Sequence, residues 1–413
     1  MKRIIPTNSS TSTLRTGTRK TGTGRNGTSH TETDQAIRKP ANRPLAISLQ
    51  RIQKELDTDG TDLGISPAFR KIRPQFDVHV FDELPSTSTQ LWDMLGAGAK
   101  SGTVAIAQQQ SAGRGQRGRV WQSEPGGLYL SLALEPDWPV ALSAQLTCFS
   151  AWGIATAFNN LGIPVQIKWP NDLFFRGKKL GGILTETKLA QQEPPAADHK
   201  NSAKAPVRIK QAVIGVGINW HNPVPQSGIS LAKILEENTY VTLQNKINCL
   251  EVLIALVLKG ILQGYYFHQQ VGSQVFMKAY QNLLTQVGNL VSIRGDSISV
   301  ADASVGSNTV DRTVIQPYKQ SHEQPRTQVA NNSNINRSGK VIGISEEGYL
   351  QVALHSQSDA AQAETHQDKA VQGEASRREA SASEASRHGT QAAPLDNFTK
   401  NILLIRPSEI HTS

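Results

Sequence analysis

From Phe76 onward, hydrophobic and polar residues follow one another in short, regular runs along the chain. Alternation with a period of two predicts half-buried strands, and unbroken apolar runs between Gly and Pro residues predict fully buried strands. Strands are predicted at 77–81, 103–108, 128–134, 165–169, 180–186 and 212–219. Apolar residues at helical spacing predict helices at 86–95, 142–161, 243–267 and 273–284. This mixture of helices and strands indicates an α+β domain.

The pattern changes after Val287, where only short strands remain. They are predicted at 290–294, 339–344, 349–354 and 401–405. Between them lie two inserts, 302–338 and 356–394, that are rich in Gln, Asn, Ser and Ala and poor in large apolar side chains. Such segments cannot bury enough apolar surface to fold by themselves. We therefore expect a small β-barrel from which two disordered inserts protrude.

These changes in hydrophobic pattern and composition divide the 413 residues into three parts. Residues 1–75 are a low-complexity basic arm and lead-in, expected to be largely disordered, although 46–56 has a weak helical pattern. Residues 76–286 form the main domain, interrupted by a polar insertion at 188–206 that we interpret as a long hairpin loop. Residues 287–413 form the small C-terminal domain.

One glycine-rich motif of the main domain matches the spacing of a dinucleotide-binding turn. Residues 113–119 read Gly-Arg-Gly-Gln-Arg-Gly-Arg, and their glycines match the G-x-G-x-x-G spacing of dinucleotide-binding turns. That turn requires a helix to begin at the third glycine, where its N-terminus receives a pyrophosphate. Here Pro125 and Gly126-Gly127 break any helix, and 128–134 is a predicted strand. We therefore reject a Rossmann fold.

What remains is a glycine-rich loop that carries three arginines. Glycines allow the main chain to approach a ligand closely, and guanidinium groups bind phosphate or carboxylate oxygens. A second cluster, Lys168-Trp-Pro-Asn-Asp172 followed by Lys179, concentrates charged and amide groups beside a predicted strand. Each cluster alone could be a solvated basic turn. Together they indicate a site for an anionic ligand.

Composition restricts the partners and the compartment. The formal net charge is +9, and six basic residues with no acidic residue lie in positions 1–30. The rest of the chain is therefore close to neutral, and we do not expect DNA binding by the folded body. Two cysteines and no His or Cys pair at metal-binding spacing exclude a disulfide framework and a zinc site. No apolar run long enough for a membrane span is evident. We expect a cytoplasmic protein; an organellar transit peptide is the alternative interpretation of the arm.

Four motifs in order resemble those of biotin protein ligases. They are Gly-Arg-Gly-x-Arg-Gly-Arg-x-Trp from Gly113, Lys-Trp-Pro-Asn-Asp from Lys168, Lys-Leu-Gly-Gly-Ile-Leu-x-Glu from Lys179, and Gly-Val-Gly-Ile-Asn from Gly215. The resemblance covers roughly 77–290 and the terminal barrel. It implies a mixed sheet similar to that of class II aminoacyl-tRNA synthetases, with helices, followed by an SH3-like barrel. Residues 76–286 would then be the catalytic domain that binds biotin and ATP.

The family activates biotin with ATP and Mg²⁺ to biotinyl-5′-AMP and then transfers biotin to one lysine of a carboxylase carrier domain. The implied partner is the biotin carboxyl carrier protein subunit of acetyl-CoA carboxylase. Family members also form dimers through the central sheet, so a homodimer stays open. Because residues 1–75 show no recognisable helix-turn-helix, the monofunctional type is expected.

The resemblance also assigns site residues. Arg114 would contact the biotin carboxylate, and Lys179 would stabilise the developing charge, with Asp172 as a further catalytic residue. The implied biotin site consists of Ser88, Thr89, Gln90, Gln110, Gly113, Arg114, Gly115, Gln116, Lys179, Gly182 and Gly217. The implied ATP or adenylate site consists of Arg117, Arg119, Trp121, Asn171 and Asn219. No protein cluster for a metal is expected, and Mg²⁺ would arrive with ATP, with Asp172 as its candidate contact. The loop itself would be a mobile lid.

Two positions depart from the family. Gln116 stands where many members carry Arg, a residue that helps to retain the adenylate, and Gln90 stands where Asn is usual. We hypothesise that activity survives both changes, with a looser hold on the intermediate. Three alternatives stay open: a lipoate-type ligase, a biotin-sensing repressor that is also a ligase, and a non-enzymatic scaffold.

Overall fold

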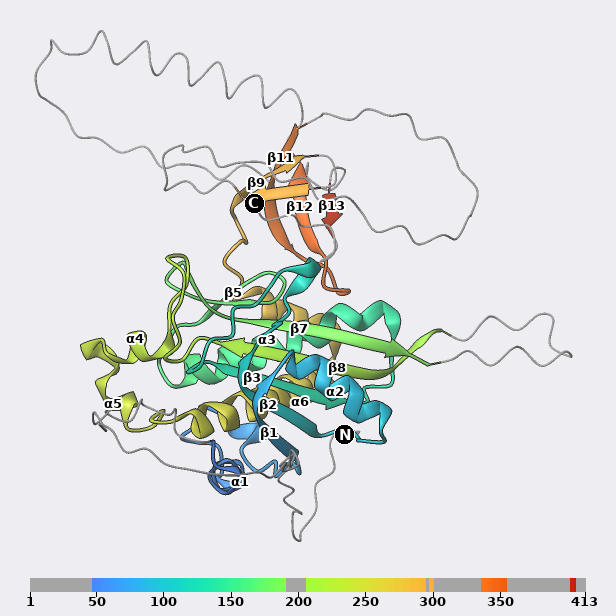
Figure 1. The fold of residues 1–413 in the computed structure, drawn as a ribbon. Helices are drawn as coiled ribbons and strands as arrows, with labels where there is room; N and C mark the ends of the chain where they lie inside the picture. The colour runs from blue at the N-terminus through green and yellow to red at the C-terminus, as the bar shows by residue number, and fades with distance from the viewer. Residues whose placement is uncertain (1–46, 191–205, 295–296, 301–335, 355–401, 406–413) are drawn as a thin grey trace, which may run out of the picture. The chain divides into compact units, whose positions relative to one another are not determined.

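In a computed structural model of the chain, the described residues are 47–190, 206–294, 297–300, 336–354 and 402–405 (Figure 1). They form two compact units. The first unit runs to Thr285 and includes Glu346–Gly348, and the second contains Gln286–Ser345 and the residues from Tyr349 onward.

The first unit is built on an eight-stranded mixed sheet in the order β1-β2-β3-β8-β7-β6-β5, with β4 paired to β8. Its strands are β1 (Asp77–Leu84), β2 (Thr103–Gln110), β3 (Leu128–Leu134), β4 (Trp138–Pro139), β5 (Gln166–Lys168), β6 (Asp172–Phe175), β7 (Lys178–Leu189) and β8 (Arg208–Ile218). β1 and β2 are parallel, whereas the other pairs are antiparallel. The predicted α+β class with a mixed sheet is confirmed. The strand β6, which separates two turns, was not predicted.

The helices cover both faces of this sheet. They are α1 (Leu49–Asp57), α2 (Thr87–Gly96), α3 (Ser143–Asn160), α4 (Leu231–Leu235), α5 (Val241–Gln244) and α6 (Leu250–Gln281), with 3₁₀ turns η1 (Pro67–Phe69), η2 (Gln116–Gly118), η3 (Val140–Leu142) and η4 (Asn238–Tyr240). Neighbouring residues of a strand point to opposite faces. On β7, Glu186 accepts a hydrogen bond from Trp92 of α2, and Thr185 accepts one from Thr147 of α3. Thus α2 lies on one face and α3 on the other.

The helical segment after residue 243 differs in detail from the expected pair of helices. Residues Val241–Gln244 form the separate short α5, and α6 begins only at Leu250. Inside α6, Gly272 has φ 77° and ψ 169°, which interrupts the helical backbone. Because a positive φ favours glycine, this residue provides the break that was predicted between two helices.

Residues 47–75 are packed, which differs from the largely disordered lead-in that the sequence indicated. The side chain of Ser48 caps α1 by accepting from the N–H of Arg51, and the apolar side of this helix is buried through Ile52 and Leu56. Leu63 and Ile65 continue the buried stretch. Sequence periodicity did not reveal this packing because only nine residues are helical and the rest pack through turns. Residues 1–46 lie outside the described part of the chain.

Two helical segments, Val140–Asn160 and Leu250–Gln281, are long and apolar enough to cross a membrane by length and composition alone. Most of each segment is buried inside the first unit. A helix that is apolar on all sides is also what the core of a large globular domain requires. Their composition is therefore that of core helices packed against each other and the sheet.

The second unit is an antiparallel five-stranded sheet in the order β10-β9-β11-β12-β13. The strands are β9 (Leu290–Arg294), β10 (Ser297–Val300), β11 (Asn336–Ile344), β12 (Leu350–Leu354) and β13 (Ile402–Ile405). Val291, Val341 and Val352 are buried in it. β10 was not predicted, and β11 begins inside the segment assigned to the first insert. Residues 302–335 of that insert, the whole of 356–394, and 191–205 of the polar insertion lie outside the described residues.

Glycines determine how closely α3 and α6 approach. A Cβ atom on Gly153 would lie 1.9 Å from the carbonyl oxygen of Gly260, and one on Gly264 would lie 2.0 Å from that of Phe149. These contacts involve main-chain atoms, which cannot rotate away. We therefore expect Gly153→Ala to lower the free energy of unfolding by about 1–3 kcal/mol, as overpacking does. Gly96→Ala, where a Cβ meets nothing within 4 Å, should cost nothing. Urea unfolding of both variants measures the difference, and equal stabilities would contradict it.

A buried lysine links the lead-in to α6. Lys259 donates to the carbonyl oxygen of Thr58, and burial, aided by Arg73, lowers its pKa from 10.5 to about 8. Between about pH 8 and 10.5 the unfolded chain holds a proton that the folded chain lacks, so stability from this group rises with pH. We expect the stability of the natural chain relative to Lys259→Met to increase across this interval. Chemical denaturation at several pH values measures it, and a constant difference would contradict the assignment.

Candidate functional site

Strands β7 and β8 present a glycine-lined floor on the face that α2 covers. Gly182 of β7 pairs with Gly217 of β8, and two residues further along Leu184 pairs with Gly215. A Cβ atom on Gly215 would lie 2.8 Å from the hydroxyl of Ser88 on α2. Because these positions lack side chains, other groups can lie directly on the sheet.

One end of the floor carries the ion pair of Lys179 and Asp172, whose Nζ and Oδ1 atoms are 2.7 Å apart. The pairing of β6 with β7 shifts register between Leu173 and Phe174, so β7 contains an extra residue there. This bulge turns Lys179 to the same face as Gly182, although the two are an odd number of residues apart. The Lys179 side chain, about one third exposed, therefore reaches the floor.

The indole of Trp121 lies on this floor. A Cβ atom on Gly217 would be 2.5 Å from the indole Cε2 and Nε1 atoms, and one on Gly182 would be 3.3 Å from Cζ3. The ammonium of Lys179 stands 5.1 Å from the ring centroid. The family resemblance assigns these two glycines to the biotin site, and in this structure Trp121 occupies the space beside them. Its buried indole N–H has no hydrogen-bond partner within the described part of the chain.

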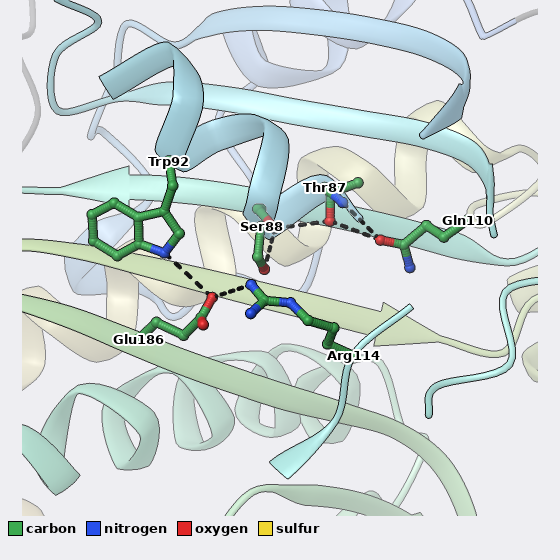
Figure 2. Close-up of polar contacts among 7 residues, drawn as sticks. Thr87, Ser88, Trp92, Gln110, Arg114 and Glu186 are labelled. Carbon is green, nitrogen blue, oxygen red and sulfur yellow. Dashed lines mark hydrogen bonds and ion pairs between the residues drawn. The ribbon is translucent and has the colours of Figure 1, made fainter. Parts of the chain in front are cut away.

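A buried network of hydroxyl and amide groups lies beside the floor (Figure 2). The side-chain oxygen of Gln110 accepts from the main-chain N–H of Thr87 at 2.8 Å. The amide group of Gln110 donates to the hydroxyl of Ser123 at 2.7 Å. The Ser131 hydroxyl is 2.8 Å from that of Thr87 and 3.0 Å from that of Ser88. Of the predicted polar residues, Ser88 and Gln110 are thus brought together, as the family resemblance implied.

Two neighbours of Ser88 on α2 point away from this network. Thr89 is exposed on α2, and Gln90 is half-buried. Their position on the helix turns them away from Ser131 because successive helical residues point about 100° apart.

Arg114 is held at the opposite end of the floor from Lys179. Its Nη2 atom lies 2.7 Å from Oε2 of Glu186, and the same oxygen accepts from Nε1 of Trp92 at 3.3 Å (Figure 2). Lys179 and Glu186 are seven residues apart on β7, roughly 20 Å at ~3.3 Å per residue. In this conformation the guanidinium group of Arg114 is therefore bound at the end of β7 remote from Lys179.

The glycine–arginine loop, residues 111–123, has a compact backbone. Gly113 is required by close approach, since a Cβ atom there would lie 2.4 Å from the carbonyl oxygen of Trp121. The N–H of Gly115 donates to the carbonyl oxygen of Arg119 at 2.7 Å, and Gln116 begins the 3₁₀ turn η2. Arg117 has φ 60°, and its pKa is lowered by burial and by the neighbouring Arg119. No α-helix opens on the third glycine, which confirms the rejection of the dinucleotide turn.

Asn171 and Asn219 satisfy main-chain groups of the protein. The amide of Asn171 donates to the carbonyl oxygen of Ile183 at 2.7 Å. The buried amide of Asn219 donates to the carbonyl oxygens of Lys179 at 3.2 Å and of Ile229 at 3.3 Å. Asn219 thus supports the strand end from which Lys179 projects. Trp169, between Lys168 and Asn171, is buried in the core.

Five residues of the site were not predicted: Thr87, Trp92, Ser123, Ser131 and Glu186. Two of them left a signal in the sequence. Ser131 is the only small polar residue within the otherwise apolar and aromatic strand 128–134, and Glu186 ends the third motif. The others depend on contacts between distant segments. Among the described residues, no group of three or more His, Cys, Asp or Glu could hold a metal ion.

The geometry thus joins a glycine-lined sheet face, a polar network beside it and an ion pair at each end. Residues 80–194 match the model of the biotin/lipoate A/B protein ligase family.

Among the relatives, the bifunctional ligase/repressor BirA of Bacillus subtilis is 36% identical over 140 residues, which cover 33% of this chain and 38% of the relative. The biotin–[acetyl-CoA-carboxylase] ligase of Paracoccus denitrificans is 30% identical over 128 residues, which cover 30% of this chain and 47% of the relative. The matches span less than two thirds of the length of these relatives. A solved biotin protein ligase from Aquifex aeolicus in complex with biotin and ATP aligns with a TM-score of 0.41 at 20% identity, covering 67% of this chain and 91% of that chain.

The contact between Trp121 and Gly217 can be tested directly. In Gly217→Ala the new methyl group overlaps the indole, so we expect the ring to lift into solvent and the tryptophan emission to shift to longer wavelength. The same substitution in a Trp121→Phe background should leave the emission unchanged. Steady-state fluorescence of the four proteins gives the answer, and an equal shift in both backgrounds would show that Trp121 does not lie on Gly217.

Proposed function

We propose that this chain is a biotin protein ligase. It activates biotin with ATP to biotinyl-5′-AMP and then transfers biotin to a lysine of a biotin carboxyl carrier protein. The observation that carries the proposal is Lys179, which a strand bulge turns onto a glycine-lined face next to the buried Ser88–Gln110 network, within the segment that matches the family. This places a cation at one end of a site and hydrogen-bonding groups along it.

In the first step an oxygen of the biotin carboxylate attacks the α-phosphorus of ATP, and pyrophosphate leaves. Both reactants are anions, so the protein has to neutralise charge that concentrates between them. Lys179 has this role, and Asp172 holds its ammonium group in place at 2.7 Å. In the second step the amine of the carrier lysine attacks the acyl carbon of the adenylate, and AMP leaves.

The polar network suits the other end of biotin. Ser88 and Gln110 present hydroxyl and amide groups for the ureido ring, with Thr87 and Ser131 orienting them. For that ring to lie on Gly182 and Gly217, the Trp121 indole moves outwards. An acceptor atom of the ligand then satisfies the indole N–H that lacks a partner in this conformation.

The remaining assignments stay proposals that rest on the family resemblance. Thr89, Gln90, Gly113, Gly115 and Gln116 belong to the biotin side, and Arg117, Arg119, Asn171 and Asn219 belong to the adenylate side. Mg²⁺ enters with the nucleotide and takes few protein ligands, as is usual for this ion, with Asp172 as the candidate carboxylate. Neutral Gln116 gives the adenylate a weaker hold than Arg would.

Finer features of the fold and of the protein's setting are proposed on the same basis. The first unit has the class II aminoacyl-tRNA-synthetase type of sheet, and the second is an SH3-like barrel, for which its five antiparallel strands are the support. Residues 76–286 and 287–413 are the corresponding domains. The protein acts in the cytoplasm on the carrier subunit of acetyl-CoA carboxylase, and a homodimer is an open prediction.

The family model includes lipoate ligases, so the decisive measurement compares the two acids. We expect exchange of labelled pyrophosphate into ATP that depends on biotin and not on lipoate. Lys179→Ala should lower the exchange rate by about 10²–10³-fold, the usual loss when one group that stabilises transition-state charge is removed. Its exposed neighbour provides the control, because Lys178→Ala should retain most of the rate.

Exchange with lipoate alone would replace the biotin assignment by the lipoate one. Absence of exchange with both acids would reject the ligase function. Mass spectrometry of proteins biotinylated in a ligase-deficient extract then identifies the carrier.

A further inference from the structure

Glu186 has a place in the structure that the proposed chemistry does not explain. It lies on β7, on the same face as Gly182, yet about four residues (roughly 13 Å) beyond it towards the end of the sheet remote from Lys179. Its carboxylate is 27% exposed and accepts from the guanidinium group of Arg114 and from the indole of Trp92. It is therefore a fixed anion that faces the glycine–arginine loop.

The sheet and helix α2 hold Glu186 in place. The backbone of Glu186 pairs with Val213 in the centre of the β7–β8 ladder. Trp92 comes from α2, which packs on the sheet through Leu91 and Leu95. The Lys188 ammonium group, also from β7, stands 4.4 Å from the centroid of the Trp92 ring. The carboxylate thus cannot follow the loop if the loop moves away.

The two ends of the loop are attached to the sheet, since Ser111 donates to the carbonyl oxygen of Leu84 and the Trp121 indole lies on Gly217, whereas the segment from Arg114 to Val120 is closed mainly on itself. Gly115 bonds to Arg119, and Arg114 bridges to Val120, so the segment between them moves as one piece. The segment also carries Arg114, Arg117 and Arg119 within six residues, and these like charges repel one another. An anion that binds one of them offsets this repulsion.

We propose that Glu186 is a positioning residue for the glycine–arginine loop. By holding the guanidinium group of Arg114, it keeps residues 111–123 folded over the sheet before any ligand binds. This inference rests on the proposed function for what the loop covers, but the ordering of the loop does not require it. Because only Nη2 of Arg114 is engaged with Glu186, the rest of the guanidinium fork remains for an anionic ligand.

The consequence is a lower entropic cost of binding. A loop that is already ordered does not have to be ordered by the ligand, and preorganisation of this kind appears as affinity. Glu186 should therefore affect the capture of the substrate more than the chemical step. A residue that only stabilised the fold would not have an effect confined to the loop and to KM. Its substitution would change other parts of the domain and kcat as well.

Hydrogen exchange of the ligand-free full chain, followed by mass spectrometry, tests the ordering. We expect peptides that cover residues 111–123 to exchange about threefold faster in Glu186→Gln and about tenfold faster in Glu186→Ala, within the range of one charged contact. Peptides of α3 and α6 should be unchanged. The matched control is Glu237→Gln, which removes the exposed pair with Arg176 at 2.9 Å and should leave the loop as it is.

A double-mutant cycle assigns the effect to the pair. In an Arg114→Gln background, Glu186→Gln should no longer change the exchange of the loop, because the interaction is already lost. Unchanged exchange in the single Glu186 variants, or the same acceleration in both backgrounds, would overturn the proposal.

Kinetics provide the second readout. In biotin-dependent pyrophosphate exchange, Glu186→Gln should raise KM for biotin about three- to tenfold and change kcat less than about twofold. A lower KM would mean that Glu186 competes with the ligand for Arg114, which overturns the proposal. If the unaltered chain shows no exchange with any acid, the ligase function fails, whereas the hydrogen-exchange result still decides whether Glu186 positions the loop.

Discussion

The antiparallel pairing of β7 with β8 is the constraint on which the site depends. Gly182 and Gly217 face each other in this ladder, so the sheet offers bare main chain where other pairs would place two side chains. Every other group of the site is positioned relative to this floor: α2 above Gly215, the Trp121 indole on Gly217, and the two ion pairs at the ends. The helices α3 and α6 stiffen the floor from the other face, and their glycine contacts hold them close to each other.

Each end of this floor carries one ion pair, and the two pairs have different roles. Lys179 and Asp172 pair at one end, and Arg114 and Glu186 pair at the other. Both pairs are partly exposed, so neither adds much to the stability of the fold. Their value lies in geometry. In the proposed function the first pair holds an ammonium group where the two anionic substrates meet, and in the further proposal the second holds a loop over the space between the pairs.

Much of the fold could be predicted from the sequence, because hydrophobic periodicity reports local burial. The strand 128–134 coincides with β3, and the predicted helix 142–161 contains α3. The failures have physical reasons. β6 is only four residues long and lies between two turns, so it shows little periodicity. The packing of 47–75 comes from turns whose apolar residues contact α6, far away in the chain, and a local pattern does not report such contacts.

The sequence by itself determined the chemical groups of the site: the arginines of the loop, Lys179, the motif glycines, and the hydroxyl and amide residues that resemble a biotin protein ligase. Only the tertiary structure decided which of them meet. Strand register and a single bulge bring Lys179 onto the glycine face, and the contact with Glu186 takes Arg114 to the opposite end. Spacing along the chain encodes neither result. The first depends on the register in which β6 and β7 pair, and the second on a side-chain contact between residues 72 positions apart.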